Sequence, residues 1–263
     1  MTDASHYVHG STDAREIARL EKQGDWTAAF TFGHFDAAPG MRVLDLATGV
    51  GAMSVRLAAR FPGVSLVGID LSAQQLAASK TNHPEMPIAR ADATRMPFAD
   101  NTFDRVHCSW LLEHVPAPAA VLKEVRRVLK PGGYCQFTEV DNASYRITPS
   151  FEEVDVTMRA LNAAQMRAGG DPFVGEVLHR YFAMAGFRRF TLEPQVLHAT
   201  TAKTPEFMAR FIDEFAEILE GLDESLGAAM VPTITKAAAQ LRSLANFPHG
   251  EMRYVALLAK GFK

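Results

Sequence analysis

Between residues 42 and 141, short apolar runs alternate with longer segments in which apolar residues recur every three or four positions. Short apolar runs bounded by turn residues are typical of buried strands, and the longer period is typical of helices. The runs predict strands at Val43–Ala47, Ser65–Asp70, Ile88–Ala91, Phe103–Ser109 and Tyr134–Val140. The intervening segments predict helices at Ala52–Arg60, Ala73–Lys80 and Pro118–Leu129. This alternation indicates a parallel sheet with helices on both faces.

The second half of the chain has a different pattern, in which helical periods are longer and strands fewer. We expect an N-terminal helix over 12–32 and later helices at Phe151–Ala168, Val174–Ala185, Thr204–Leu222 and Gly227–Ala245. Strands are expected at Phe190–Leu197 and Met252–Lys260. The expected fold is a Rossmann-like α/β sheet of seven mostly parallel strands with a helical cap over the strand ends.

These elements fit one domain over residues 1–263. The expected divisions are an N-terminal cap over 1–35, a cofactor-binding core over 36–145, helical lid elements over 146–189 and 200–250, and the last two strands over 190–199 and 251–263.

Composition narrows the class of protein. The net charge of −3 offers no basic surface for nucleic acid, and 48% apolar residues supply a sizeable core. The apolar runs are too short to span a bilayer, and the first ten residues lack the apolar stretch of a signal peptide. Cys108 and Cys135 both fall in expected buried strands, so we expect reduced core thiols and a cytoplasmic protein.

A glycine-rich turn follows the first expected strand. Gly49 and Gly51 lack a Cβ, which lets backbone approach a ligand closely. A site for NAD would have a third glycine where Ser54 stands, so that fingerprint is incomplete. Asp45, inside the strand, suits a cationic amino group held directly or through water. S-adenosylmethionine carries such a group and NAD does not, so the turn favours S-adenosylmethionine.

Two further acids follow strand ends. Asp70 ends the second expected strand, where its carboxylate can accept both hydroxyls of a ribose. The alternative is a helix cap or a solvated strand end. Asp92 follows the third expected strand and can accept from the exocyclic amine of adenine, or it can be an ordinary turn acid.

Residues 41–141 resemble class I S-adenosylmethionine-dependent methyltransferases, and they are especially similar to the branch containing the ubiquinone and menaquinone biosynthesis enzymes. The resemblance rests on four segments in order: Val43 to Gly51, Val67 to Ser72, Ala91 to Asp104, and Leu112 to Gly133. Ala47 departs from the family pattern, which usually has a glycine there. Because alanine is small, we expect cofactor binding to survive.

The resemblance implies a set of cofactor contacts in the core and the N-terminus: Tyr7, Asp45, Ala47, Gly49, Gly51, Asp70, Leu71, Gln75, Asp92, Ala93 and Ser109. In this arrangement the glycine turn faces the methionine part, Asp70 holds the ribose and Leu71 packs on the adenine. Tyr7 either closes over the cofactor or belongs to a mobile tail.

Methyl transfer is an in-line displacement, so the protein must align the acceptor and exclude water, and a base is needed only for a protonated acceptor. His114, after the fourth strand, is the candidate base, with a structural hydrogen bond as its alternative role. Candidate acceptor contacts are side chains near the strand ends or on helices of the cap: Trp26, Trp110, His114, Asp141, Tyr145, Phe207 and Phe211. The phenylalanines at helical spacing equally suit a core. No cluster has metal-ligand spacing, so no metal is expected.

The leading hypothesis is methyl transfer to oxygen, nitrogen, sulfur or carbon of a small, apolar or aromatic acceptor, of natural-product or quinone type. A protein that binds S-adenosylmethionine without transferring methyl, such as a cyclase or binding subunit, is the second hypothesis. An NAD-dependent oxidoreductase is the third, disfavoured by the incomplete glycine pattern. The apolar helical insertion is compatible with a homodimer. The acceptor itself is not encoded in a recognisable motif.

Overall fold

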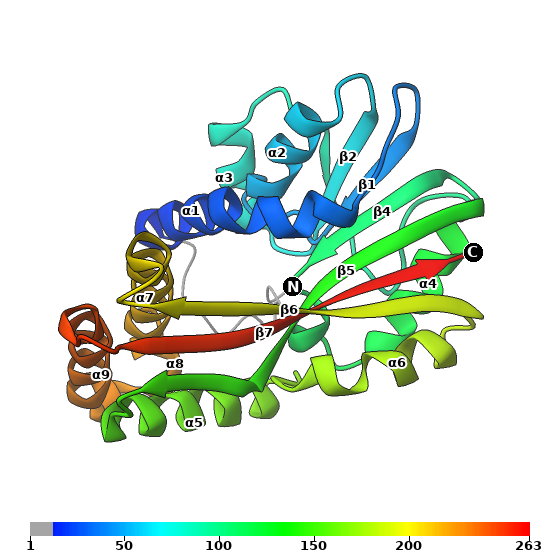
Figure 1. Cartoon of the computed structure of the whole chain (residues 1–263). Coiled ribbons are helices and arrows are strands. Elements are labelled where there is room, and N and C mark those ends of the chain that lie inside the picture. The colour runs from blue at the N-terminus through cyan, green and yellow to red at the C-terminus, as the bar shows by residue number, and fades with distance from the viewer. Residues whose placement is uncertain (1–12) are drawn as a thin grey trace.

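The computed structural model describes residues 13–263, apart from the side chains of residues 223 and 224. Within that range a seven-stranded sheet has the order β3-β2-β1-β4-β5-β7-β6 (Figure 1). The strands are β1 (Arg42–Leu46), β2 (Ser65–Asp70), β3 (Ile88–Arg90), β4 (Phe103–Ser109), β5 (Leu129–Thr148), β6 (Arg189–Thr200) and β7 (Glu251–Phe262). The predicted fold class is therefore confirmed.

The sheet is parallel except at one strand. β1 pairs in parallel with β2 and β4, and β4 pairs in parallel with β5. β7 runs antiparallel to both of its neighbours, β5 and β6. The predicted strand Tyr134–Val140 is only the middle of β5, which continues past an irregularity between Asp141 and Arg146 and pairs again with β7 as far as Thr148.

Apart from α8, which was not predicted, the helices lie close to their predicted bounds. They are α1 (Ala14–Thr31), α2 (Ala52–Arg60), α3 (Ala73–Asn82), α4 (Pro118–Val128), α5 (Glu152–Arg167), α6 (Val174–Met184), α7 (Pro205–Glu220), α8 (Asp223–Leu226) and α9 (Val231–Ser243). α1 begins where predicted because Asp13 accepts a hydrogen bond from the amide of Glu16 at 2.9 Å. Ser72 caps α3 in the same way through Gln75.

Alternation along β1 divides the core into two clusters. Leu44 and Leu46 face one side and pack in the cluster that includes Val121 and Leu122 of α4, whereas Val43 faces the other side with Leu57 of α2. Successive side chains of a strand point to opposite faces, so both faces of β1 need a helical cover. β1 is accordingly buried along almost its whole length.

The cap is a group of helices, α5, α7, α8 and α9, that lies where β6 ends and β7 begins (Figure 1). α9 packs against both α7 and α5, and α1 reaches α7 from the N-terminal side. α6 lies elsewhere: it packs on α4 and on β5 and β7, so it covers the sheet. The stretch 146–189, predicted as one lid element, therefore divides between the cap (α5) and the sheet cover (α6).

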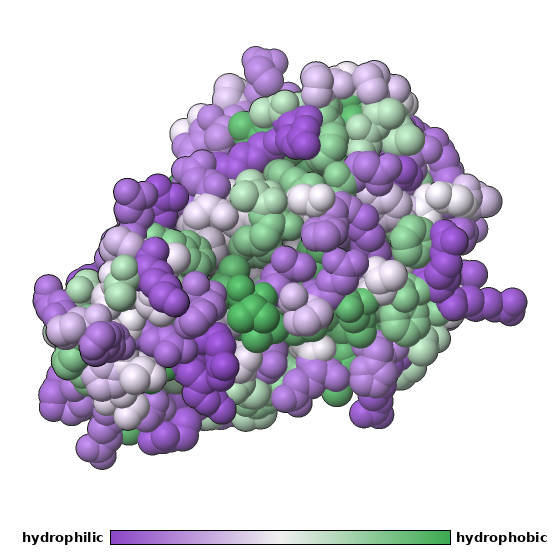
Figure 2. Space-filling view, viewed as in Figure 1, coloured by the Kyte–Doolittle hydropathy of each residue, from purple (hydrophilic) through white to green (hydrophobic). Residues whose placement is uncertain are grey.

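The surface seen in Figure 2 is mostly hydrophilic, with apolar residues gathered in small patches near the middle of that face. Among the described residues, every helix is too short or too polar to cross a lipid bilayer. Cys108 and Cys135 are buried, unpaired thiols on the adjacent strands β4 and β5, as expected from the sequence.

A buried glutamate fixes the turn that follows β4. Glu139 of β5 is fully buried, and its Oε1 accepts from the amides of both Leu111 at 3.2 Å and Leu112 at 2.9 Å, while its Oε2 accepts from the amide of Glu113 at 3.4 Å. Burial and the nearby Glu113 raise the pKa of Glu139 to about 8. The turn it holds carries Glu113 and His114 to the strand ends, so this side chain sets the position of part of the site.

The raised pKa of Glu139 predicts a pH-dependent stability. The folded protein holds this proton more tightly than the unfolded chain does, so stability is full below the ordinary glutamate pKa and falls as pH rises through about 8. We expect Glu139→Gln to flatten this dependence, so that the difference in free energy of unfolding between wild type and variant changes by about 4 kcal/mol between pH 5 and pH 9. Urea unfolding at both pH values measures it. Glu152→Gln, at an exposed position, is the control, and equal slopes for wild type and Glu139→Gln would contradict the assignment.

Candidate functional site

A cavity of about 290 Å³ opens at the carboxyl ends of β1, β2 and β4, between the sheet and the cap. Ligands of open α/β sheets bind at this edge, where loops rather than strand backbone meet the ligand. One part of the wall comes from the strand ends of the core. The other part comes from α1, α5, α7 and the turn after β4.

The turn after β1 brings bare backbone to the cavity. Gly49 has φ of 55°, and a Cβ added there would lie 2.7 Å from Oε1 of Gln75. Ala47 also has a left-handed φ of 57°, a conformation that glycine adopts without strain and alanine does not. Alanine at position 47, where the family usually has glycine, is thus accommodated with some backbone strain, and the turn still follows the left-handed conformation. Ala47, Gly49 and Gln75 all line the cavity.

Asp70 is built into the same turn. Its Oδ2 accepts from the amide of Gly49 at 2.9 Å, and its Oδ1 accepts from the amide of Ser72 at 2.8 Å. Burial raises the pKa of this carboxyl above its ordinary value, although the two amides oppose that shift. Each carboxylate oxygen has a second lone pair, so the group can still accept from a ligand's hydroxyls. These features fit the ribose diol of a nucleoside.

Asp45 is satisfied within the protein. Its carboxylate accepts from Thr48 and from Ser54, the residue that stands in place of the third glycine. It also lies 2.7 Å from Nδ1 of His107, whose Nε2 lies 3.3 Å from the hydroxyl of Ser109. These bonds link Asp45 through His107 to Ser109 at the end of β4. The role of Asp45 toward an amino group stays a prediction.

The mouth of the cavity has an apolar side chain beside a turn acid. Leu71 is 38% exposed, although large apolar side chains are usually covered, and it lies on the cavity wall. Asp92 accepts from the amide and the hydroxyl of Thr94, each at 2.7 Å, so it has the structural turn role weighed above. Asp92 and Ala93 also line the cavity, so the turn role and a ligand contact are compatible.

The cap side of the wall holds three of the predicted acceptor contacts, Trp26, Trp110 and His114. His114 is 8% exposed, and burial lowers its pKa below the ordinary histidine value. Its ring is therefore neutral near pH 7, the form that can accept a proton. Trp110 has φ of 58°, which turns the chain sharply where β4 ends.

Five predicted site residues lie outside the wall. Gly51 faces α3, where a Cβ would lie 2.6 Å from the hydroxyl of Ser79. Asp141 accepts from the amide of Ala143 in a turn of β5, and Tyr145 stacks on Phe215 in the core. Phe207 and Phe211 pack behind Trp26 and belong to the hydrophobic contacts of the cap. Tyr7 lies outside the described residues.

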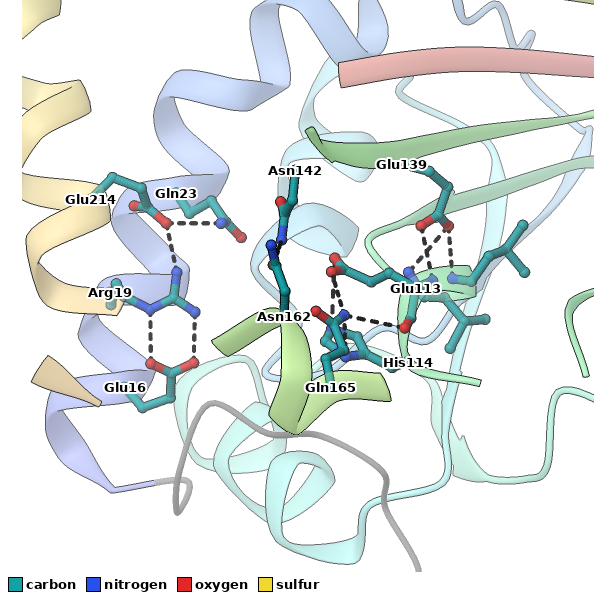
Figure 3. A network of polar contacts seen from close by, with 12 residues as sticks. Glu16, Arg19, Gln23, Glu113, His114, Glu139, Asn142, Asn162, Gln165 and Glu214 are labelled. Atoms are coloured by element: carbon teal, nitrogen blue, oxygen red, sulfur yellow. Dashed lines mark hydrogen bonds and ion pairs between the residues drawn. The ribbon is translucent and has the colours of Figure 1, made fainter. Parts of the chain in front are cut away.

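The structure adds polar wall residues that the sequence did not single out, drawn in Figure 3: Arg19, Gln23, Glu113, Asn142, Gln165 and Glu214. Glu113 adjoins His114, so its place in the motif was a usable signal. The others come from α1, α5, α7 and the extension of β5, and only packing of those elements brings them together.

Among residues 13–263, no three histidine, cysteine, aspartate or glutamate side chains stand where they could hold a metal ion.

Comparison with known proteins agrees with this site. Residues 44–137 match the methyltransferase domain family. The chain is 38% identical over 138 residues to a demethylmenaquinone methyltransferase of Renibacterium salmoninarum, an alignment that covers 52% of this chain and 56% of the relative. The chain thus spans about half the length of the curated relatives it matches.

Solved structures share the fold. A phosphoethanolamine N-methyltransferase of Haemonchus contortus, in complex with S-adenosyl-L-methionine, has a TM-score of 0.58 at 20% identity, over 90% of this chain and 52% of that one. The 4+2 cyclase SpnF has a TM-score of 0.56 at 24% identity, over 92% of this chain and 80% of that one.

The matched segment contains the glycine turn, Asp70, Asp92 and Ser109, which together form the core side of the cavity wall. Over residues 44–137 the chain therefore matches a methyltransferase domain, and the curated relatives that share this region are demethylmenaquinone methyltransferases.

Proposed function

We propose that the protein transfers a methyl group from S-adenosylmethionine to a small acceptor held between the sheet edge and the helical cap. The observation that carries the proposal is Asp70, a half-buried carboxylate fixed by the amides of Gly49 and Ser72 beside a turn whose backbone is not covered by side chains. The methyltransferase-domain match over residues 44–137 supports the same assignment.

The core side of the wall would hold the cofactor in three parts. Asp70 accepts from the ribose hydroxyls, and Leu71, with Asp92 and Ala93, covers the adenine at the cavity mouth. The Ser109 hydroxyl, held by His107 and through it by Asp45, faces the methionine part. When bound, the cofactor supplies a methyl group on a positively charged sulfur, which makes its carbon electrophilic.

The cap side would align the acceptor. α1, α5 and α7 close over the strand ends, so the acceptor enters a space from which most water is displaced. His114 lies on the wall with a lowered pKa, so its neutral ring can take a proton from an acceptor that arrives protonated. Gln165 approaches Nδ1 of His114 at 3.5 Å and orients the ring.

The substrate class follows from the relatives and from the apolar part of the wall. The curated relatives are named as demethylmenaquinone methyltransferases, and Met158, Leu161, Phe215 and Ile218 offer an apolar surface next to the polar groups. A quinol or another small aromatic compound of a quinone or natural-product pathway fits this surface. The likeness to a cyclase favours a second candidate, cofactor binding without methyl transfer, which the assays below separate.

We expect Asp70→Asn to weaken S-adenosylmethionine binding at least tenfold, because a neutral amide loses the charge-assisted bonds to the ribose, on the order of 1.5 kcal/mol or more. Isothermal titration calorimetry measures it. Asp155→Asn, at an exposed position on α5, is the matched control and should bind like wild type. Wild-type affinity in Asp70→Asn would contradict the ribose assignment.

The raised pKa of Asp70 predicts the pH dependence of that binding. Protonation removes an acceptor that the ribose hydroxyls use, so affinity should fall as pH is lowered toward the raised pKa. Titrations at pH 7 and pH 5 should show weaker binding at the lower pH in wild type. In Asp70→Asn this part of the pH dependence should be absent, and an unchanged slope would count against Asp70.

Methyl transfer itself is tested with demethylmenaquinol and a panel of phenols, amines and thiols, using release of S-adenosylhomocysteine as the signal. His114→Asn should lower kcat at least tenfold for acceptors that must lose a proton, while the affinity for S-adenosylmethionine stays within twofold. Cofactor binding without turnover on any acceptor would favour the cyclase or binding role. Full kcat in His114→Asn would remove this residue from the mechanism.

A further inference from the structure

The charge of the cavity wall is strongly unbalanced. Among the described residues on the wall, the carboxylates are Asp45, Asp70, Asp92, Glu113 and Glu214. Arg19 is the one arginine or lysine among them. Residues 1–12 contain neither lysine nor arginine, so that segment cannot bring a further side-chain cation of this kind to the wall.

The positive charge of Arg19 is already neutralised. Its guanidinium donates to both oxygens of Glu16, at 2.8 and 2.6 Å, and to Glu214 at 2.6 Å (Figure 3). All three side chains are more than nine-tenths buried. One cation shared by two carboxylates leaves this part of the wall with a net negative charge, and an incoming anion would have to compete with two buried ion pairs.

Glu113, in the turn after β4, places another carboxylate on the cavity wall, apart from the ion pairs of Arg19. Its Oε2 accepts from Nε2 of Gln165 at 2.7 Å, and Nε2 of His114 lies 3.7 Å from its Oε1. The side chain is 8% exposed, and it lies on the cavity wall. Oε1 therefore retains the capacity to accept a hydrogen bond from a bound molecule.

Next to Glu113, the remaining polar groups form a chain that ends inside the protein. The hydroxyl of Tyr254 donates to Oδ1 of Asn142 at 2.7 Å. In turn, Nδ2 of Asn142 donates to Asn162 at 2.8 Å (Figure 3). The hydroxyl hydrogen of Tyr254 and one of the two amide hydrogens of Asn142 are already used, whereas the Tyr254 oxygen still accepts. This side of the wall thus offers acceptors for hydrogen bonds and few unused donors.

From this arrangement we infer the chemical class of the acceptor: a molecule with an apolar body that presents a hydroxyl or amino hydrogen to Glu113 and carries no anionic group. The inference rests on the proposed methyl transfer and names Glu113 as a residue that determines specificity. Carboxylates, phosphates and diphosphates are disfavoured, because buried carboxylates repel them and no unshared guanidinium or ammonium on the described wall compensates.

The test uses three probes with one ring system and different charge: 2-naphthol, 2-naphthylmethylamine and 2-naphthoate. Each is titrated by calorimetry into the full-length protein saturated with S-adenosylhomocysteine. We expect the naphthol and the amine to bind at least tenfold more tightly than the carboxylate. In Glu113→Gln the affinity for the amine should fall at least fivefold, and the affinity for the carboxylate should rise. The control Glu152→Gln should leave all three affinities unchanged.

Several results overturn the inference: a carboxylate that binds wild type as tightly as its partners, ratios that Glu113→Gln does not change, or no binding of any probe to the loaded protein. If Glu113→Gln fails to fold, the ratios in wild-type protein alone decide. Binding of S-adenosylhomocysteine is measured first and separately. If S-adenosylhomocysteine does not bind, the proposed function is wrong. If it binds but the probes show a different order of affinity, only the inferred acceptor class is wrong.

Discussion

The carboxyl edge of the parallel sheet carries carboxyl groups that are wholly or partly withdrawn from water, and the loops around them are arranged to supply each one with hydrogen bonds. The carboxylate of Asp45 accepts hydrogen bonds from Thr48 and Ser54 and lies beside Nδ1 of His107. The carboxylate of Asp70 accepts from the amides of Gly49 and Ser72. The carboxyl group of Glu139 accepts hydrogen bonds from backbone amides of the turn after β4. Because an unsatisfied buried carboxylate is so costly, these bonds decide the course of the loops that form the cavity.

The same requirement joins the cap to the core. Arg19 of α1 lies between Glu16 on its own helix and Glu214 on α7, so the N-terminal helix and the inserted helices are held together by a buried ion pair. Removing Arg19 would leave the two carboxylates in the interior without a counter-charge. The cap is therefore held in one arrangement over the strand ends, and its polar residues face the cavity in a defined pattern. The ion pairs that hold the cap in place therefore also help to shape the cavity.

The local pattern of the chain predicted most of the sheet and helices, because strand and helix periods and caps such as Asp13 and Ser72 depend on near neighbours. Predictions on the cap were weaker. Phe207 and Phe211 have a spacing that suits either a core or a pocket, and only their packing behind Trp26 decides between the two. Tyr145 follows a strand end as a pocket residue would, but the long β5 carries it into the core against Phe215.

The sequence by itself determined the class of the fold and the core side of the cavity wall, since the glycine turn, Asp70 and Asp92 lie within a few residues of the strands that position them. The tertiary structure alone decided the charge and polarity of the cap side of the wall. Arg19 and Glu214 are 195 positions apart, and Glu113 and Gln165 are 52 apart. No local period encodes such pairs, because they form only when helices distant in the chain pack over the same strand ends.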